Sequence, residues 1–557
     1  MDEKEIVKQI LDSYDEISVT KEEKDIVFFT LKDKEYGFWY TMKHDDTRSP
    51  FILVKNEEKY NYPHILPINI PIDRQKQDKY RVICLYENDS TIKYLQTYEE
   101  KIFDTVERLI ELLSLTGLEI EKEFQKEFLY YWNDMAEDQS TVDLFLNRER
   151  VFKRMNAYHD NKAKNRFVDN TIRLSDFDKQ NEGKKIWNHK SELPVFYIPI
   201  IDNRRILPPT RDQSWDAKNI LMIINGREYR RISHDSYQRM EKEKVKTSTV
   251  GLVFEMIVDG NSINFVTRVK FKSAKNDTLL NKLKKEISSV EIVKSKRMDY
   301  YYLSRQIGND TSIIGRKVLL IGAGSLGSYV AKELVKAGIC DLAIYDSDTI
   351  EHENILRHNV DKIWVNSYKV DALKYSLEWI HPEIHVRSVA KNIDEELLKE
   401  EMLKNDLVIF TVGNSDVQLE CNGVLSQNNF SKPVIYAWLE AGGEVSHILT
   451  VDYSKGGCFE CLYTDQNGQL VNNKANNPLD EFVEALTIRN GCGATRVAYG
   501  TAILLRTTSV LLDTLPKVLD GKIKHNSLID ISPTGVVDQG NNFTERKCRY
   551  CGHRDRE

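Results

Sequence analysis

The pattern of apolar and polar positions is clearest between residues 318 and 348. Residues 318–321 are an unbroken apolar run, which is typical of a parallel strand buried on both faces. The next apolar positions recur at i, i+4 and i+8, which predicts a helix with one apolar face: Leu326, Val330 and Leu334. Gly338 stands where a C-terminal helix cap belongs, and a second apolar run ends at Asp346. The pattern therefore predicts a strand, a helix and a strand of an α/β fold.

The first apolar run leads into three glycines in the G-x-G-x-x-G spacing: Gly322, Gly324 and Gly327. Such glycines let backbone N–H groups approach a phosphate at the N-terminus of a helix. Asp346 follows about 20 residues later, at the end of a strand, where an acid can bind ribose hydroxyls. These residues alone favour an ordinary NAD-binding crossover.

The residues that follow Asp346 change this interpretation. A second acid, an amide and an arginine arrive together at Asp348, Asn354 and Arg357, and Lys369 lies one short segment further on. A nicotinamide site needs no cluster of cations, whereas attack on ATP does, because charge develops on the phosphate oxygens. The stretch therefore predicts an ATP site.

This stretch resembles the adenylation domain of the ThiF, MoeB and ubiquitin-activating enzyme superfamily, from Arg305 to the C-terminus. The resemblance implies that the chain binds ATP and adenylates the C-terminal carboxylate of a small carrier protein. It also implies that Asp346 binds the ribose, that Asn354 and Arg357 bind the phosphates, and that Lys369 binds the triphosphate. Arg305 would reach the ATP of the other subunit in a homodimer.

One position departs from the family pattern. After the apolar strand at residues 406–410, the family usually has Thr-Asp-Asn with the aspartate on magnesium, but here Gly413 stands between Val412 and Asn414. Magnesium binding has then moved to Asp348 or Asp416, or it is weaker.

Four of the eight cysteines form two C-x-x-C pairs: Cys458 with Cys461, and Cys548 with Cys551. Two such pairs can complete the tetrahedral shell of one zinc ion. The alternative is a pair of structural or redox dithiols, but a reducing cytoplasm disfavours disulfides. A zinc site with four cysteine ligands has no open position for water, so its role would be structural.

Residues 1–148 predict a separate α+β domain. Three β-rich runs separated by charged or turn residues suggest a meander, and two helical stripes follow it, at residues 102–113 and 124–132. The order resembles the ubiquitin-conjugating enzyme fold, with Tyr62-Pro63 at the place of that family's Tyr-Pro segment and Cys84 at the place of its catalytic cysteine. Residues 123–132 resemble the closing helix of the bacterial branch of this fold.

The Cys84 region lacks the His-Pro-Asn that the conjugating family has before its cysteine. The family's asparagine stabilises an oxyanion, so another donor such as Asn88 has to be found, or transfer is slower. A buried structural thiol at the end of a strand is the alternative for Cys84.

Residues 149–297 predict a mixed linker domain. They begin with a polar segment, and the runs at residues 250–258 and 263–271 flank Asp259-Gly260, which is a hairpin signal. We therefore expect an α/β protein with a Rossmann-like ThiF-type adenylation domain at residues 298–557, joined by this linker to the ubiquitin-conjugating-like domain.

A further cysteine, Cys492, lies beside glycines just before a helical, largely apolar run. In the family this place holds the cysteine that takes the carrier from AMP as a thioester. A helix N-terminus favours the thiolate, which supports such a role. The alternative is a helix-cap cysteine packed in the core.

The composition is ordinary for a soluble protein, and we expect a cytoplasmic one. Of 557 residues, 41% are hydrophobic and 30% are charged, and no apolar run of the length that spans a membrane is present. The first residues are too acidic for a signal peptide. A net charge of −7 gives no reason to expect nucleic acid.

The whole chain resembles the fused activating and conjugating enzymes of bacterial ubiquitin-like conjugation, in particular those of the CBASS anti-phage operons. This implies a thioester relay through Cys492 and Cys84 and an amide bond to a target amine, with a cyclic-nucleotide synthase as the protein that is conjugated. Two alternatives stay open: a sulfur-carrier protein adenylyltransferase, which does not need Cys84, and a non-catalytic nucleotide-binding scaffold, which Gly413 allows.

Overall fold

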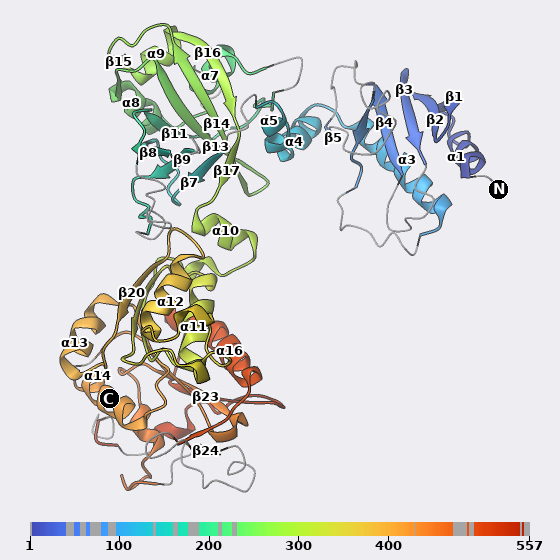
Figure 1. Cartoon of the computed structure of the whole chain (residues 1–557). Helices are drawn as coiled ribbons and strands as arrows, with labels where there is room; N and C mark the ends of the chain where they lie inside the picture. The colour runs from blue at the N-terminus through green and yellow to red at the C-terminus, as the bar shows by residue number, and fades with distance from the viewer. Residues whose placement is uncertain are drawn as a thin grey trace.

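The computed structural model shows three bodies of secondary structure that follow one another along the chain (Figure 1). The residues it describes are 3–40, 50–55, 63–66, 80–86, 96–136, 141–159, 165–175, 189–209, 214–225, 231–428, 430–471, 487–489, 495–545 and 548–550. In these ranges no helix combines the length and the apolar character that crossing a membrane requires.

The first body is an antiparallel sheet with helices on one face. Its strands have the order β1-β2-β3-β4-β6-β5. Their bounds are β1 (Ile17–Glu23), β2 (Ile26–Leu31), β3 (Lys34–Trp39), β4 (Phe51–Lys55), β5 (Ile65–Leu66) and β6 (Tyr80–Ile83). Helices α1 (Glu3–Leu11) and α3 (Tyr98–Ser114) share one apolar core with this sheet. The predicted α+β class of the N-terminal region is confirmed.

Helix α3 forms where local sequence and packing agree. Thr97 and Glu100 form a capping box, which satisfies free N–H groups at the start of the helix. Its apolar stripe is fully buried against the sheet, at Ile102, Val106 and Leu109.

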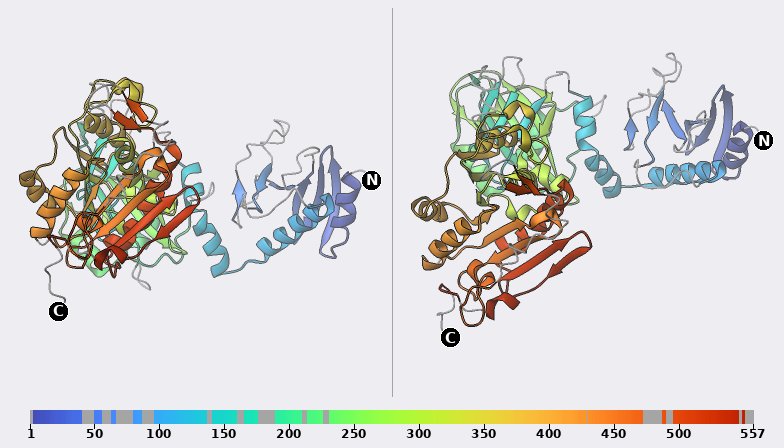
Figure 2. Two further views of the ribbon diagram at one scale, coloured as in Figure 1. Left: turned by 90° about the horizontal axis from the view of Figure 1, so that it is seen from below. Right: turned by 60° about the horizontal axis from the view of Figure 1, so that its bottom comes forward.

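Two short helices, α4 (Leu118–Lys126) and α5 (Phe128–Asp134), lead from the first body to the second (Figure 2). The side chains of Phe128 and Trp132 are fully buried in the core of the second body. The indole Nε1 of Trp132 donates to the Val293 carbonyl at 3.2 Å. The segment that resembles a closing helix of the first domain is therefore anchored in the second, because its large aromatic residues bury their apolar surface there.

The second body is built on a sheet with the order β16-β14-β13-β11-β8-β9-β7-β17, in which β10 also pairs with β8. The bounds are β7 (Val142–Phe145), β8 (Lys153–His159), β9 (Asn165–Asp169), β10 (His189–Lys190), β11 (Val195–Pro199), β13 (Thr249–Val258), β14 (Asn261–Phe271), β16 (Ile287–Val293) and β17 (Ser295–Arg297). The long β13–β14 hairpin turns at Asp259 and Gly260, which both have positive φ, as a two-residue hairpin turn requires.

Helices and a small strand pair complete the second body. Helices α7 (Ala217–Asn225), α8 (His234–Lys242) and α9 (Leu279–Lys285) contribute apolar residues to the core that holds Trp132. Strands β12 (Lys244–Val245) and β15 (Asp277–Thr278) pair with each other beside α9. The helices cover one face of the sheet, and the anchored end of α5 is buried between these helices and the sheet.

The third body contains the predicted α/β sheet, in the order β20-β19-β18-β21-β22-β23-β26-β27. The strands are β18 (Lys317–Ile321), β19 (Asp341–Tyr345), β20 (His385–Val389), β21 (Leu407–Phe410), β22 (Val434–Leu439), β23 (Ser446–Val451), β26 (Ser527–Ser532) and β27 (Gly535–Asp538). Pairing is parallel from β20 to β22 and antiparallel from β22 to β27.

Helices cover both faces of this sheet. Helices α11 (Ser325–Ala337), α12 (Lys369–Glu378) and α16 (Thr501–Leu519) share a core with Val318 and Leu320. Helices α13 (Glu395–Lys404) and α14 (Ser415–Gln427) share another with Leu319 and Ile321. Alternate residues of β18 thus face opposite layers, as a strand buried on both sides requires. The Rossmann-like α/β class of the C-terminal region is confirmed.

The second and third bodies are joined by ordered contacts around helix α10 (Tyr300–Gln306). The Tyr300 amide donates to Glu383 Oε1 at 2.8 Å, and the His381 Nε2 donates to the Met298 carbonyl at 2.7 Å. Burial raises the pKa of Glu383 to about 8 and lowers the pKa of His381 to about 4. Both side chains are therefore neutral near pH 7, which suits a junction with little water.

Candidate nucleotide and thiol sites

The glycine loop lies between the C-terminal ends of β18 and β21. Gly322 has a φ of +100°, and its carbonyl accepts a hydrogen bond from the Thr411 hydroxyl at 2.7 Å. A Cβ atom on Gly327 would lie 2.0 Å from the Gly322 carbonyl oxygen, so only glycine fits there. A Cβ atom on Gly324, by contrast, would meet no described atom within 4 Å. Gly322 and Gly327 are thus closely packed against the protein, whereas Gly324 faces open space. A loop that binds a phosphate needs both features.

Asp346 borders this loop from the end of β19. Its Oδ2 accepts from the Ala323 amide at 2.7 Å, and its Oδ1 accepts from the Asp348 amide at 2.8 Å. The Gly322 amide donates to the Tyr345 carbonyl at 2.9 Å, which ties the loop to the same strand end. The predicted ribose-binding acid therefore contacts the predicted phosphate loop directly.

Lys369 and Asp348 form an ion pair beside Asp346. The Lys369 Nζ lies 2.6 Å from Asp348 Oδ2, and the lysine side chain is 12% exposed, whereas the aspartate is 66% exposed. The Lys369 amide also donates to the Asp348 carbonyl at 2.9 Å. The start of α12 thus places a shielded cation on the exposed Asp348, which Asp346 links to the glycine loop.

The segment between β19 and α12 carries the other predicted phosphate ligands. Asn354 is buried, and its carbonyl accepts from the Arg357 amide at 2.9 Å. The Arg357 Nε has no hydrogen-bond partner among the described residues. A buried donor without a partner is costly, and an anionic ligand would satisfy it.

His358 is a site residue that the sequence patterns did not indicate. Its Nε2 donates to the Ala323 carbonyl of the glycine loop at 2.7 Å, and the side chain is only 5% exposed. Burial lowers its pKa to about 4, so the ring is neutral. A histidine next to Arg357 has no special spacing, and only the fold brings it to the loop.

Arg305 and Gly413, two positions singled out from the family pattern, make no hydrogen bond to the glycine loop among the described residues. Arg305 donates from Nη2 to the Gly260 carbonyl at 3.2 Å, so it contacts the β13–β14 turn of the second body. Gly413 follows β21, and a Cβ atom there would meet no described atom within 4 Å. Asn414 caps α14 by accepting from the Asp416 amide at 2.9 Å. Asp348 and Asp416, the two predicted alternatives for magnesium, lie on the segments that follow β19 and β21.

Residues 308–533 match the sequence profile of the ThiF family. They form a ThiF-family domain. The resemblance to the ThiF, MoeB and ubiquitin-activating enzyme superfamily is thereby confirmed.

The chain is also similar to individual proteins. A Pseudomonas aeruginosa protein named ATP-dependent ubiquitin transferase-like protein Cap2 is 23% identical over 217 residues, which are 38% of this chain and 38% of that protein. A Haemophilus influenzae molybdopterin-synthase adenylyltransferase is 31% identical over 103 residues, which are 18% of this chain and 42% of that protein. The matched segments thus span less than half of these relatives. A solved structure of Escherichia coli MccB with ATP has 20% identity and a TM-score of 0.34, and the match covers 43% of this chain and 68% of that one.

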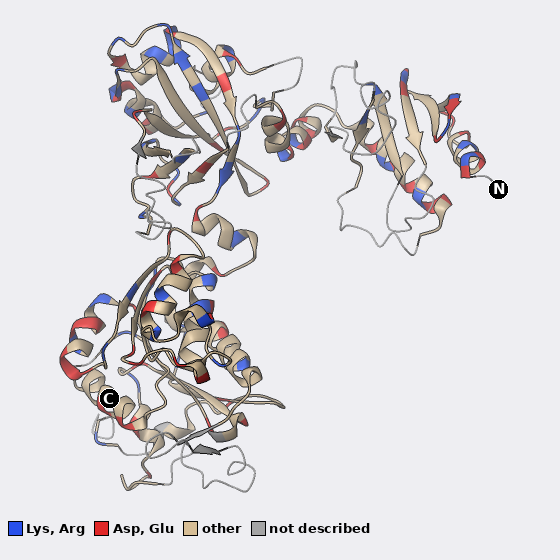
Figure 3. Ribbon diagram, viewed as in Figure 1, with Lys and Arg blue, Asp and Glu red and all other residues tan. Residues whose placement is uncertain are grey.

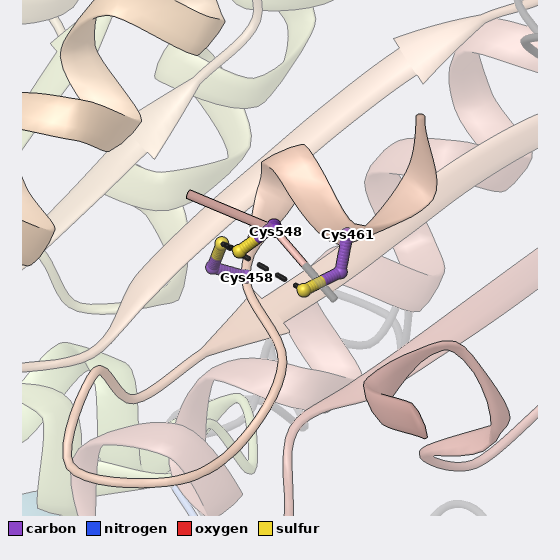
Figure 4. A group of neighbouring side chains, drawn as sticks. All are labelled: Cys458, Cys461 and Cys548. Carbon is purple, nitrogen blue, oxygen red and sulfur yellow. Dashed lines mark hydrogen bonds between the residues drawn. The ribbon is translucent and has the colours of Figure 1, made fainter. Parts of the chain in front are cut away.

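The predicted zinc ligands Cys458 and Cys461 lie in the ThiF-family domain, and Cys548 lies beyond its matched residues. The three cysteines lie together (Figure 4). The Cys458 Sγ is 3.9 Å from the Cys461 Sγ and 3.6 Å from the Cys548 Sγ. Four thiolates about 2.3 Å from a tetrahedral zinc ion would be separated by about 3.8 Å. The buried thiols therefore fit three ligands of a zinc ion, and Cys551 lies outside the described residues.

Neighbouring polar groups support this cluster. The Asn422 Nδ2 donates to the Cys458 Sγ at 3.6 Å, and its Oδ1 accepts from the Phe459 amide at 3.1 Å. Glu460 binds the Arg549 amide at 3.0 Å, which holds the Cys548 segment against the first cysteine pair. Such contacts orient metal ligands from outside the coordination shell.

Outside the ThiF-family domain, Cys84 follows strand β6 and is half-buried. Its amide donates to the His64 carbonyl at 2.7 Å, and its thiol lies 3.3 Å from the Tyr86 carbonyl. On α5, burial raises the pKa of Tyr130 to about 12, and the charge of Cys84 contributes to this shift. The other predicted thiol, Cys492, and the predicted donor Asn88 lie outside the described residues.

Proposed function

We propose that this protein uses ATP to adenylate the C-terminal carboxylate of a carrier protein and then conjugates the carrier to a target amine. The observation that carries the proposal is the glycine loop with Asp346, Arg357 and Lys369 around it, in a ThiF-family domain. The similarity to a protein named ATP-dependent ubiquitin transferase-like protein supports the conjugation step.

In the first reaction, the carrier carboxylate attacks the α-phosphorus of ATP, and pyrophosphate leaves. The N-terminus of α11 and the loop amides would bind phosphate oxygens, and Arg357 and Lys369 would neutralise the charge that develops. Since Lys369 pairs with Asp348 in the free chain, a bound triphosphate would compete for the lysine. This would release the Asp348 carboxylate to bind a magnesium ion together with Asp416, in place of the missing aspartate at Gly413. Magnesium would neutralise the charge of the pyrophosphate leaving group.

In the later reactions, the Cys492 thiolate attacks the acyl-AMP carbonyl and releases AMP. The Cys84 thiolate then takes the acyl group and frees Cys492, and a target amine finally attacks the second thioester and frees Cys84. Each thioester keeps the carboxylate activated after AMP has left. The separate α+β body that carries Cys84 supports this assignment.

The same proposal includes partners and metal. Zinc would be held by Cys458, Cys461, Cys548 and Cys551 and would support folding rather than chemistry. A homodimer would let Arg305 reach the nucleotide of the other subunit. The conjugated protein would be a cyclic-nucleotide synthase of a cytoplasmic anti-phage system, which rests on the family resemblance alone.

Variants at the two thiols test the relay. Cys492→Ala should still exchange pyrophosphate into ATP but form no thioester, and Cys84→Ala should stall with the carrier on Cys492. Non-reducing gels with ATP and a candidate carrier protein detect both species. Formation of the amide product by Cys84→Ala at the parent's rate would reject the relay.

A sulfur-carrier protein adenylyltransferase is the second candidate, favoured by the similarity to a molybdopterin-synthase adenylyltransferase. It shares the adenylation step and needs no transfer to Cys84. A thioester on Cys84 would therefore exclude it. A non-catalytic scaffold, in turn, predicts that pyrophosphate exchange is absent from the parent protein.

A further inference from the structure

His64 lies directly across from Cys84 at the edge of the first sheet. Strands β5 and β6 are antiparallel, with Ile65 opposite Ile83, and the bond from the Cys84 amide to the His64 carbonyl continues this pairing by one residue. His64 has a φ of +70°, a conformation that residues other than glycine rarely adopt. Such a backbone persists when its surroundings hold it in place.

Glu127 holds both the backbone and the ring of His64. The His64 amide donates to Glu127 Oε2 at 2.8 Å, and the His64 Nδ1 lies 2.8 Å from Glu127 Oε1. The His64 Nε2 lies 3.3 Å from Glu123 Oε2. Because carboxylates only accept hydrogen bonds, the protonated ring satisfies both contacts. Burial alone would lower the pKa of His64, but the hydrogen bond to Glu127 and the charges of Glu127 and Glu123 raise it overall.

Tyr131 adds a second link between the same two elements. Its hydroxyl accepts from the Ile65 amide at 3.2 Å and donates to Glu127 Oε2 at 3.2 Å. Residues 127 and 131 are one helical turn apart, so they present their side chains on the same side of the chain. The contacts from His64 and Ile65 therefore all end on one surface of α4 and α5.

That surface belongs to a segment fixed on the second body. Phe128 and Trp132 are buried in its core, and the Gln125 Nε2 donates to the carbonyls of Asn203 and Ile206 at 2.6 and 3.0 Å. Figure 3 shows acidic and basic residues together on α4, which lies between the two bodies. A continuous series of contacts therefore runs from the second core through Glu127 and His64 to the backbone of Cys84.

We propose that His64 is a positioning residue, which fastens the strand end of Cys84 to the helices anchored in the second body. The group of His64, Glu123, Glu127 and Tyr131 is called the His64 clamp below. This proposal rests on the proposed function, in which Cys84 is the thiol that accepts the carrier. Holding that thiol at a fixed distance and direction raises its effective concentration for transfer from the ThiF-family domain.

Hydrogen–deuterium exchange tests the clamp without the carrier. In His64→Ala and Glu127→Gln, amides of the peptide covering residues 80–86 should exchange about tenfold faster, because the charged hydrogen bonds that hold the His64 carbonyl opposite Cys84 are lost. His64→Gln keeps a side-chain donor for Glu127 and should restore part of the protection. Lys122→Ala removes an exposed charge from the same helix and should leave the exchange unchanged.

The rate at which iodoacetamide alkylates Cys84, followed by peptide mapping, is a second measurement. At low temperature a general loss of stability would not change this rate. We expect the rate to change at least threefold in His64→Ala and Glu127→Gln, in proportion to the exchange. Unchanged exchange and alkylation in both variants would overturn the clamp. If His64→Ala does not fold, Glu127→Gln decides, because the amide has the shape of the carboxylate. Pyrophosphate exchange by the parent tests the proposed function separately, so the two failures can be told apart.

Discussion

The nucleotide site and the Cys84 site are built in different ways. The first is formed by one continuous stretch, from Gly322 to Lys369, in which strand ends and backbone geometry bring the groups together. The second combines a strand edge at His64 and Cys84 with a carboxylate at Glu127, which comes more than 40 residues later and is anchored in another body. A site made by backbone geometry can be found in a sequence as a motif. A site made by packing between bodies has no such signature.

The largest expected effect is on the nucleotide site itself. Lys369→Ala should lower the rate of ATP–pyrophosphate exchange by about 10² to 10³, because a preorganised cation stabilises the transition state. Lys336→Ala is the matched control, since that lysine pairs with Glu333 on an exposed part of α11. Retention of the parent's exchange rate by Lys369→Ala would show that the stretch does not form the ATP site.

The glycine loop gives the next largest effect. A methyl group on Gly327 collides with the Gly322 carbonyl, so Gly327→Ala should lower the free energy of unfolding by about 1 to 3 kcal/mol and weaken ATP binding. Thermal unfolding with and without ATP measures both effects. Gly413→Ala has open space and should unfold like the parent. An unchanged melting temperature for Gly327→Ala would mean that the loop relaxes easily and that backbone geometry does not define this site.

The cysteine cluster gives a smaller, structural effect. Cys548→Ser should reduce bound zinc from one equivalent to near none and lower the melting temperature, because metal binding contributes to folding. Zinc analysis and thermal unfolding measure this. Cys340→Ala removes a thiol far from the cluster in sequence and should keep the metal. A parent protein that contains no zinc and is as stable as a zinc-loaded sample would contradict the structural role.

The smallest effect concerns the junction between the second and third bodies. The folded pKa of Glu383 is about 8, against an ordinary value near 4.5. The carboxyl therefore contributes its full stability below pH 4.5, and this contribution is lost as the pH rises toward 8. Glu383→Gln keeps an acceptor for the Tyr300 amide, so its melting temperature should exceed the parent's by several degrees at pH 8 and by little at pH 5. An equal difference at both pH values would show that Glu383 is ionised throughout.

The different construction of the nucleotide site and the Cys84 site explains which features could be inferred from the sequence. The strand, glycine loop and acid at Asp346 were predictable, because sterics restrict which residues can form that turn. Cys458 and Cys461 were predictable as neighbours, because C-x-x-C places two sulfurs on one turn, and Cys548 was predictable beside them because two such pairs match the four ligands of one zinc ion. The ligand assignments of these residues stay predictions until binding is measured.

Other features depend on contacts that no local pattern indicates. His358 reaches the glycine loop only because the segment after β19 folds back over α11. Phe128 and Trp132 have the apolar spacing of a helix that closes the first domain, yet they pack in the second core, and periodicity does not tell which core a helix enters. His64 has no recognisable spacing to Glu127, since two bodies have to meet before the pair exists.

The contact between Cys458 and Cys548 has a further consequence for the unfolded chain. The two residues are 90 positions apart, and α16, β26 and β27 lie between them. A metal ion bound to both would close a loop of that length, and the entropy lost on closure is about 4 kcal/mol for a flexible chain. Removing the metal with a chelator would open this loop again and return that entropy to the unfolded chain.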